Sequence, residues 1–312
     1  MRFHLDTKLS DYIKVGGTMN GGYNKSQSGE TSTRTNAGVN TAAVQARPDQ
    51  PYMDAQGNLL PWSDYTYGFE TFTPNPLQTL NNKNIRNSYN FIGNSYVEVT
   101  PIKNLSVKAD VNSALFINQN SIFSPKSTMV NFGFANKSTL TDLENVSSNL
   151  TTNLTANYDF KIKENNFGFL VGYSWDRTKY RDKRNTYSGF PDDEVLTNAS
   201  SAERVTSYSD QTVESGINSL FSRLTYNYKD KYNVTVNFRT DASSKFGPEN
   251  KRGYFPSISG SWNLAKEAFL ADNSIINKLQ LRASIGKVGS TNVANFSYLQ
   301  FFSTSSSNLY AG

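Results

Sequence analysis

Apolar and polar residues alternate along one stretch of the chain, which is interrupted by a short polar turn. Apolar residues recur at every second position in most of the ranges 220–228 and 232–238, with polar residues between them. Successive side chains of a β-strand point to opposite faces, so the stretch predicts two strands with one apolar and one polar face. The turn is Lys229-Asp230-Lys231. A hairpin of this kind, with tyrosines at the strand ends, is typical of a transmembrane β-barrel.

The same alternation predicts about ten strands along the chain. Several are longer than the roughly 9 to 11 residues that a tilted strand needs to cross a bilayer. The fold class is therefore all-β, an antiparallel transmembrane barrel wall. The predicted strands are Arg2 to Leu9, Ile13 to Lys25, Arg86 to Pro101, Leu105 to Ile117, Leu150 to Ile162, Phe167 to Trp175, the two halves of Leu220 to Thr240, Tyr254 to Leu264, and Leu279 to Lys287.

The connections between these strands are alternately short and long, and the long ones all fall at one end. Outer-membrane barrels have short periplasmic turns and long extracellular loops, which matches this asymmetry. In the first long connection, 37–46 is a possible helix ended by Pro48, and 265–278 suggests a short helix or packed turn on the periplasmic side. The predicted long connections are 26–85, 118–149, 177–219 and 241–253.

Asn20-Gly21-Gly22 leaves two interpretations open. Asn-Gly is a strong hairpin signal, and a turn here would add a strand and exchange the two faces beyond it. We prefer a continuous strand, because Val15, Met19 and Tyr23 then keep to one side.

Composition supports a barrel and excludes several other classes. Hydrophobic residues make up 37% of the 312 residues, and no apolar run approaches the ~18 residues of a membrane-spanning helix. Aromatic residues reach 13%, which suits an apolar outer band. The formal charge of +5 is scattered, so we assign it to the lumen and loops rather than to nucleic-acid binding. The first residues, Met1 to Asp6, lack the features of a signal peptide.

Polar residues at alternate strand positions are predicted to line the lumen. They provide hydrogen-bonding amides and a few charges on the face opposite the lipid. The predicted lumen-facing residues are Lys108, Asp110, Asn153, Asn157, Arg223, Asn233, Asn237 and Arg239.

The sequence does not support an enzyme, a cofactor or a metal centre. Cysteine is absent and His4 is the single histidine, which leaves no catalytic triad or multi-histidine site. No phosphate-binding glycine motif is present. The acidic run Asp192-Asp193-Glu194 is either a calcium ligand set or, as we favour, a solvated loop.

A row of cations with a period of two marks the start of one long connection. Arg177, Lys179, Arg181 and Lys183 share one face of an extended chain. They either attract anionic lipopolysaccharide or an anionic substrate, or are simply solvated, which we favour.

An aromatic segment in the first long loop is the strongest candidate for substrate or partner binding. Aromatic rings stack on sugars or anchor a protein partner, and neighbouring polar groups provide hydrogen bonds. The alternative is that the rings pack together and order the loop. The candidate residues are Trp62, Asp64, Tyr65, Tyr67, Phe69 and Phe72.

The residues from Arg239 onward resemble a known family. The stretch Arg239-Thr240-Asp241-Ala242-Ser243-Ser244-Lys245-Phe246-Gly247-Pro248, followed by Gly253-Tyr254-Phe255-Pro256-Ser257, is similar to the signature of SusC/RagA-type TonB-linked outer-membrane proteins. Trp262, Phe269-Leu270 and 279–293 resemble its continuation, and 47–58 and 75–77 are weaker matches. We expect a structural role for the signature residues Asp241, Ser243, Ser244, Phe246, Gly247, Pro248, Gly253, Phe255 and Pro256.

The resemblance implies part of a nutrient importer in the outer membrane of a Gram-negative, Bacteroidetes-type bacterium. Members of the family import glycan or peptide fragments together with a SusD-like surface lipoprotein and draw energy from TonB. They carry a signal peptide, a plug domain and a barrel of about twenty-two strands. We expect residues 1–312 to be a partial barrel domain without the signal peptide, plug and C-terminal strands. The rival hypothesis is a secreted β-sheet adhesin or glycan-binding module, whose apolar face would pack on a second sheet.

Overall fold

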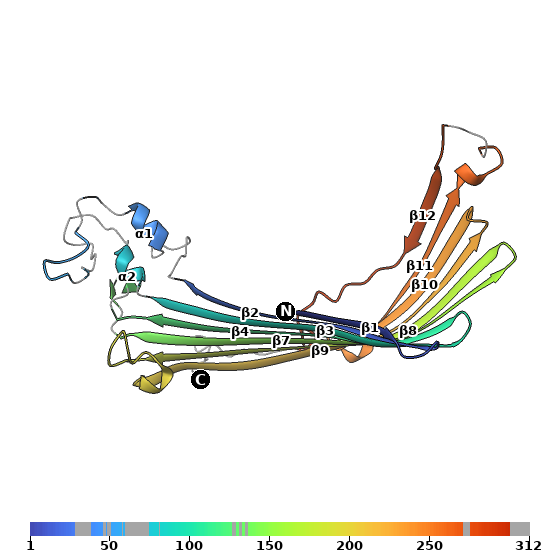
Figure 1. The fold of residues 1–312 in the computed structure, drawn as a ribbon. Coiled ribbons are helices and arrows are strands. Elements are labelled where there is room, and N and C mark those ends of the chain that lie inside the picture. Colours follow the sequence, from blue (N-terminus) through green and yellow to red (C-terminus); the bar gives the residue numbers. More distant parts are fainter. Residues whose placement is uncertain are drawn as a thin grey trace, which may run out of the picture.

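The computed structural model contains one large antiparallel sheet of ten strands (Figure 1). The structure describes residues 1–28, 39–45, 48, 51–57, 59, 75–80, 82–126, 129–130, 133–134, 137–270 and 275–299. The ten strands follow one another across the sheet in chain order, and each pairs with the next. The predicted all-β antiparallel fold class is confirmed.

All ten predicted strands are present, with altered ends. A further two-stranded hairpin, β5 (Met129–Val130) and β6 (Gly133–Phe134), lies in the connection between β4 and β7. The strands of the large sheet are β1 (Arg2–Lys8), β2 (Ile13–Ser28), β3 (Lys83–Ile102), β4 (Leu105–Ser124), β7 (Thr139–Ile162), β8 (Asn165–Ser188), β9 (Arg204–Tyr228), β10 (Tyr232–Ser243), β11 (Arg252–Asn263) and β12 (Gln280–Gly286).

Short helical elements lie in the connections. The helix predicted over 37–46 is present as α1 (Val39–Gln45), and α2 (Pro76–Leu80) precedes β3. Single 3-10 turns are η2 (Ala199–Ser201), η3 (Pro248–Asn250) and η4 (Leu264–Lys266), the last at the predicted packed turn. None of the described helices is long and apolar enough to cross a membrane.

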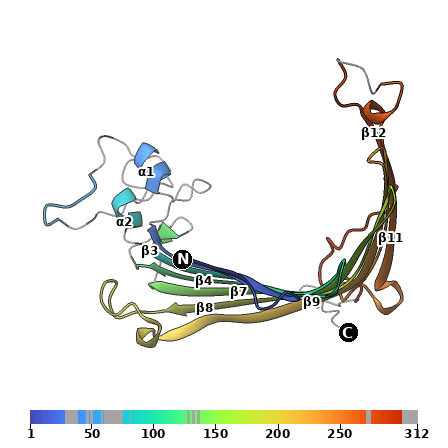
Figure 2. The same ribbon diagram turned by 45° about the vertical axis from the view of Figure 1, so that its right-hand side comes forward.

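The sheet is a curved wall with two different ends (Figures 1 and 2). At one end, the turn end, lie the short connections 9–12, 103–104, 163–164 and 229–231, with the longer 264–279 beside them. At the other, the loop end, lie the long connections, with α1 and α2 among them. Within the described residues β1 pairs only with β2 and β12 only with β11, so these strands are the two edges of an open sheet.

Strand register divides the wall into an apolar face and a polar face. In the hairpin of β9 and β10, Leu224 lies opposite Val236, while the adjacent Arg223 lies opposite Asn237. Following the register through β8 and β7 to β4 places all eight predicted lumen-facing residues on the polar face. The alternation of apolar and polar residues in the sequence therefore matches the two faces of the folded sheet.

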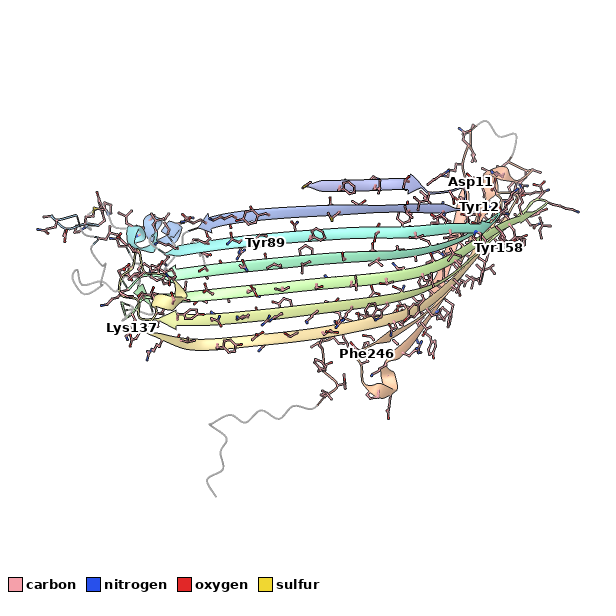
Figure 3. The ribbon with its side chains drawn as sticks, turned by 60° about the horizontal axis from the view of Figure 1, so that its bottom comes forward. Asp11, Tyr12, Tyr89, Lys137, Tyr158 and Phe246 are labelled. Carbon is pink, nitrogen blue, oxygen red and sulfur yellow. The ribbon has the colours of Figure 1, made fainter. Side chains whose placement is uncertain are left out.

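The apolar face is exposed rather than packed into a core. Leu224 is 47% exposed, Val236 41% and Phe238 43%. Among the described residues, only Phe123 and Leu140 are buried apolar side chains. Figure 3 shows side chains along the wall, with Tyr158 at the turn end, Lys137 at the loop end and Tyr89 between them. Backbone pairing between strands, not a hydrophobic interior, holds this part of the fold together.

The strands extend far beyond their predicted limits at the loop end, so the predicted loops 118–149 and 177–219 are wrong in extent. β7 and β8 each have 24 residues, and β9 has 25. The apolar alternation that marks a strand stops near Trp175, but backbone pairing continues because charged side chains replace apolar ones across the strands. Arg177 pairs with Glu214 at 2.6 Å, for example. Between β8 and β9 the connection is 189–203.

The structure also decides the alternative at Asn20-Gly21-Gly22. β2 runs through this segment and pairs with β3 on both sides of it, so the continuous strand is confirmed. In contrast, the predicted turn Lys229-Asp230-Lys231 does reverse the chain, and Lys229 and Asp230 have φ angles of 50° and 54°. Both angles lie in the left-handed region, which the two-residue turns of hairpins require.

Candidate functional site

Amide and carboxylate groups form a hydrogen-bonded row on the polar face. The side-chain amide of Asn94 donates to the Asn112 carbonyl oxygen at 2.7 Å, and the Asn112 amide donates to Asp110 at 2.7 Å. Asn153 donates to the same Asp110 oxygen at 2.9 Å. The row crosses β3, β4 and β7 and orients these side chains through mutual hydrogen bonds.

A second polar row crosses β9, β10 and β11. Arg223 Nε donates to Asn237 Oδ1 at 2.9 Å, and the Asn237 amide donates to Ser257 at 3.2 Å. Nearer the turn end, Asn227 donates to Asn233 at 2.5 Å. These side chains present amide, hydroxyl and guanidinium groups on the polar face.

Two lysines and a carboxylate surround Tyr96 on the same face. The Tyr96 hydroxyl donates to Asp6 at 2.6 Å, and the Lys14 ammonium lies 3.7 Å from Asp6. The ammonium of Lys108 lies 4.5 Å from the Tyr96 ring centroid. Lys108, predicted to face the lumen, therefore has an aromatic neighbour that the sequence pattern did not indicate.

Arg239 is fixed by three neighbours on the polar face of β10. Its Nε donates to Asp241 Oδ1 at 2.7 Å, and its Nη2 donates to Ser219 Oγ at 2.9 Å. The Phe221 ring centroid lies 5.8 Å from its guanidinium carbon. Ser219 is 1% exposed, so the bonded hydroxyl is withdrawn from solvent.

The signature residues after Arg239 build the connection between β10 and β11. Ser244 continues the pairing with β9: its N–H donates to the Gly216 carbonyl, and its hydroxyl accepts from the Gly216 N–H, both at 2.9 Å. The Ser243 N–H donates to the Lys251 carbonyl at 2.9 Å and closes the loop. Gly247 precedes η3, which begins with Pro248. These contacts lie in and beside the connection between β10 and β11, and the structural role of the group stays a prediction.

Phe255 packs between two glycines on the polar face. A Cβ at Gly253 would lie 2.6 Å from the Phe255 ring, and a Cβ at Gly289 would lie 2.4 Å from it. Gly289 belongs to residues 287–299, here called the return segment, which follows β12. The Lys245 ammonium donates to the Thr291 carbonyl at 3.2 Å. The signature residues Phe255 and Lys245 therefore contact the return segment, which is distant from them in the sequence.

The acidic run in the connection between β8 and β9 orders its own loop. The Asp192 carboxylate accepts hydrogen bonds from the N–H groups of Val195, Glu194 and Leu196, and these bonds hold the pKa of Asp192 below its ordinary value. Asp193 accepts from the Lys126 N–H at 3.1 Å. No group of three potential metal-binding side chains occurs within the described residues.

The row of cations on β8 lies on the register of the apolar face, beyond the apolar residues. Arg181 pairs with Asp210 at 2.5 Å, as Arg177 does with Glu214. Lys179 lies opposite Glu214 on β9, and Lys183 lies opposite Glu144 on β7. Carboxylates on both flanking strands thus balance the cations, which favours a cross-strand ladder over a site for anions.

Two sequence candidates remain: His4, which the structure describes, and the aromatic segment, which lies outside the described residues. His4 Nδ1 lies 2.9 Å from Thr18 Oγ1 on the polar face, as an ordinary strand residue. The aromatic candidates Trp62, Asp64, Tyr65, Tyr67, Phe69 and Phe72 lie outside the described residues.

Comparison with known proteins gives no matching family model but finds similar receptors. TonB-dependent receptor P26 of Formosa agariphila is 29% identical over 293 residues, which are 92% of this chain and 28% of that receptor. TonB-dependent receptor SusC of Bacteroides thetaiotaomicron is 28% identical over 250 residues, 77% of this chain and 24% of SusC. The chain is related to the SusC-type TonB-dependent receptors. It spans less than a third of the length of these relatives.

A solved structure shares the fold of this SusC-related chain. The structure of the RagAB peptide transporter superposes with a TM-score of 0.79 and 20% sequence identity. The match covers 94% of this chain and 33% of the RagAB chain. The curved, open sheet therefore corresponds to part of a larger fold.

A carboxylate at the turn end of this SusC-related wall has no counterpart among the sequence candidates. Glu267 Oε1 accepts from the Tyr232 hydroxyl at 2.6 Å and from Trp262 Nε1 at 3.0 Å. Its Oε2 accepts from the Lys231 ammonium at 3.1 Å. These donors lower the pKa of Glu267 to about 2. Trp262 is five residues from Glu267, but Tyr232 is 35 residues away, so only the resemblance near Trp262 indicated this site in the sequence.

We expect Glu267→Gln to lower stability at neutral pH and to flatten its dependence on acid. The ordinary pKa of the carboxyl is 4.5, and its folded value is about 2. The stabilisation is thus complete above pH 4.5 and is lost as the pH falls toward 2. Urea midpoints of the folded protein in detergent, measured between pH 7 and 2.5, test this. Tyr232→Phe removes one donor and should behave intermediately, whereas equal acid slopes for Glu267→Gln and wild type would contradict the assignment.

Proposed function

We propose that these residues form part of the wall of an outer-membrane, TonB-dependent nutrient importer. The proposal rests on the exposed apolar face of the sheet. The strand register places the hydrogen-bonded polar residues on the opposite face across the ten strands. A wall of this kind places one face in lipid and the other along an aqueous lumen. The relation to TonB-dependent receptors supports the same assignment.

The two ends of the wall indicate its orientation. On β8 the apolar positions run from Phe167 to Trp175, close to the ~9 to 11 residues that cross a bilayer as a tilted strand. The charged ladder begins at Arg177, beyond the apolar band. We place the turn end in the periplasm and the loop end, with its charged strand extensions, outside the cell.

The cargo we propose is a fragment of glycan or peptide, delivered together with a SusD-like surface lipoprotein and driven by TonB. The polar rows around Asp110 and Asn237 offer the hydrogen bonds that both kinds of polymer use. The similar RagAB structure is that of a peptide transporter, and SusC is a TonB-dependent receptor. The aromatic residues at 62–72 remain the predicted contact for substrate or lipoprotein.

A double substitution in the aromatic segment tests substrate or partner binding. In the complete gene product, Trp62→Ala with Tyr65→Ala should reduce uptake of the growth substrate at least tenfold, since aromatic anchor contacts are worth ~2 kcal/mol. Growth of a deletion strain complemented with each variant, on oligosaccharides and on peptides as sole sources, measures the effect.

Phe169→Ala is the matched control, because it also removes a ring but lies on the lipid-facing side, where Phe169 is 46% exposed. Unchanged uptake and unchanged lipoprotein association in the double variant would contradict the role of the aromatic segment.

A separate measurement tests the rival adhesin hypothesis. A folded barrel shifts its gel mobility on heating, whereas a water-soluble sandwich that needs no detergent would exclude the importer.

A further inference from the structure

A lysine occupies the first position of the three short turns 103–104, 163–164 and 229–231 at the turn end. Lys103, Lys163 and Lys229 lie in the turns of the hairpins β3–β4, β7–β8 and β9–β10, which are consecutive in the wall. Neighbouring strands are ~4.8 Å apart, so successive turns are about 10 Å apart along the rim. All three side chains are exposed. They form a row of cations, here called the rim lysines.

The backbone at two of these turns is unfavourable for lysine. Lys163 has a φ of 52° and Lys229 a φ of 50°. Glycine and asparagine adopt this left-handed conformation with less strain, which is why they dominate such turns. The third turn has Asn104, with a φ of 71°, at its left-handed position. Positions 163 and 229 are therefore occupied by lysine although their backbone conformation disfavours it, which indicates that the charge has a function.

Aromatic rings line the apolar face directly beside the rim lysines. Phe160 stacks on Phe167 at 5.0 Å between centroids, and Tyr232 stacks on Trp262 at 6.3 Å. Such rings lie at the boundary between hydrocarbon and headgroups. The Lys229 ammonium lies 5.5 Å from the centroid of the Tyr228 ring, which belongs to the apolar face. This ammonium is therefore on the lipid side of the rim, level with the headgroups.

Two other lysines at the turn end have carboxylate partners. Lys231 pairs with Glu267 at 3.1 Å, and Lys266 pairs with Asp230 at 3.3 Å. Within the described part of the chain, no carboxylate lies in ion-pair contact with a rim lysine. Their charge is thus available to an external anion.

We propose that Lys103, Lys163 and Lys229 bind the phosphate groups of anionic phospholipids in the periplasmic leaflet and set the depth of the wall in the membrane. The inference rests on the membrane placement proposed above. A lipid is favoured over a protein partner because the row begins where the apolar aromatic face ends, which is where headgroup phosphates lie.

Native mass spectrometry of the complete gene product in detergent micelles tests the proposal, with phosphatidylglycerol and phosphatidylcholine as probes. Wild type should retain phosphatidylglycerol preferentially. The double variant K163N/K229N should weaken its retention about twentyfold, from roughly fivefold for each lysine near an anionic surface. Asparagine suits the left-handed backbone better than lysine, so this variant should fold at least as well as wild type.

Two controls separate charge and position from other effects. K163R/K229R keeps the charge and should retain phosphatidylglycerol as wild type does. K161Q removes a nearby charge whose register partners, Asn166 and Asn227, lie on the polar face, and it should change nothing. Equal retention of both lipids by wild type, or unchanged retention in K163N/K229N, would overturn the proposal. Absence of a heat-dependent mobility shift in wild type would instead refute the membrane placement itself.

Discussion

Val236→Arg should prevent stable insertion, whereas Thr235→Arg in the next position should be tolerated. Val236 lies on the apolar face, midway along β10, opposite Leu224 and Ile258, and it is 41% exposed. An arginine on the lipid face near the bilayer midplane costs about 2–4 kcal/mol. Such a loss is a large fraction of the net stability of a folded protein. Thr235 lies on the polar face, where an arginine reaches water.

Urea unfolding of the complete gene product in liposomes measures the difference, with heat-dependent gel mobility as the test of folding. Thr235→Arg is the matched control because it adds the same side chain to the same strand. Equal stability losses for the two variants would contradict the separation of lipid and lumen faces. Full retention of stability in Val236→Arg would contradict the placement of the apolar face in the membrane.

Phe255→Ala should release the return segment from the wall. The ring fills the space between Gly253 and Gly289 and so contacts both the wall and the return segment. Phe255 is half-buried, so truncation should cost on the order of 2 kcal/mol, below the 3–5 kcal/mol of a fully buried ring. A change of 2 kcal/mol increases the opening of the segment about thirtyfold.

Hydrogen exchange of peptides covering the return segment detects this opening. The amides of Val293 and Leu299, which donate to Thr291 and Phe296, should exchange faster. Tyr254→Ala serves as control because it removes the adjacent ring from the opposite, apolar face, where Tyr254 is 53% exposed. Equal exchange in both variants would show that Phe255 does not hold the segment.

The strands and their faces were predictable because each depends on short-range information. Alternation along β9 and β10 places Leu224 and Val236 on one face whatever the distant chain does. The register then follows from the turn at Lys229-Asp230-Lys231, since a short turn leaves one way to align the two strands. The same reasoning placed Asp110 and Asn153 on the polar face.

The extent of the strands was not predictable from apolar alternation. Beyond Trp175 apolar alternation stops on β8, and the cations that recur there with a period of two suit a solvated loop as well as a strand. Pairing persists because Arg177 and Arg181 bind carboxylates on β9 that lie 37 and 29 positions further along the chain. The loop around Asp192 likewise depends on backbone N–H donors, which apolar alternation does not reveal.

By itself, the sequence determined the all-β class, the order of the ten strands, the two faces and the relation to SusC-type receptors. Those features depend on the period of two and on local motifs, which neighbouring residues specify. Only the tertiary structure decided the length of the strands, the packing of Phe255 on Gly289 and the binding of Glu267 to Tyr232, Trp262 and Lys231. These features join residues that are distant in the chain, and no local pattern specifies which of them will meet.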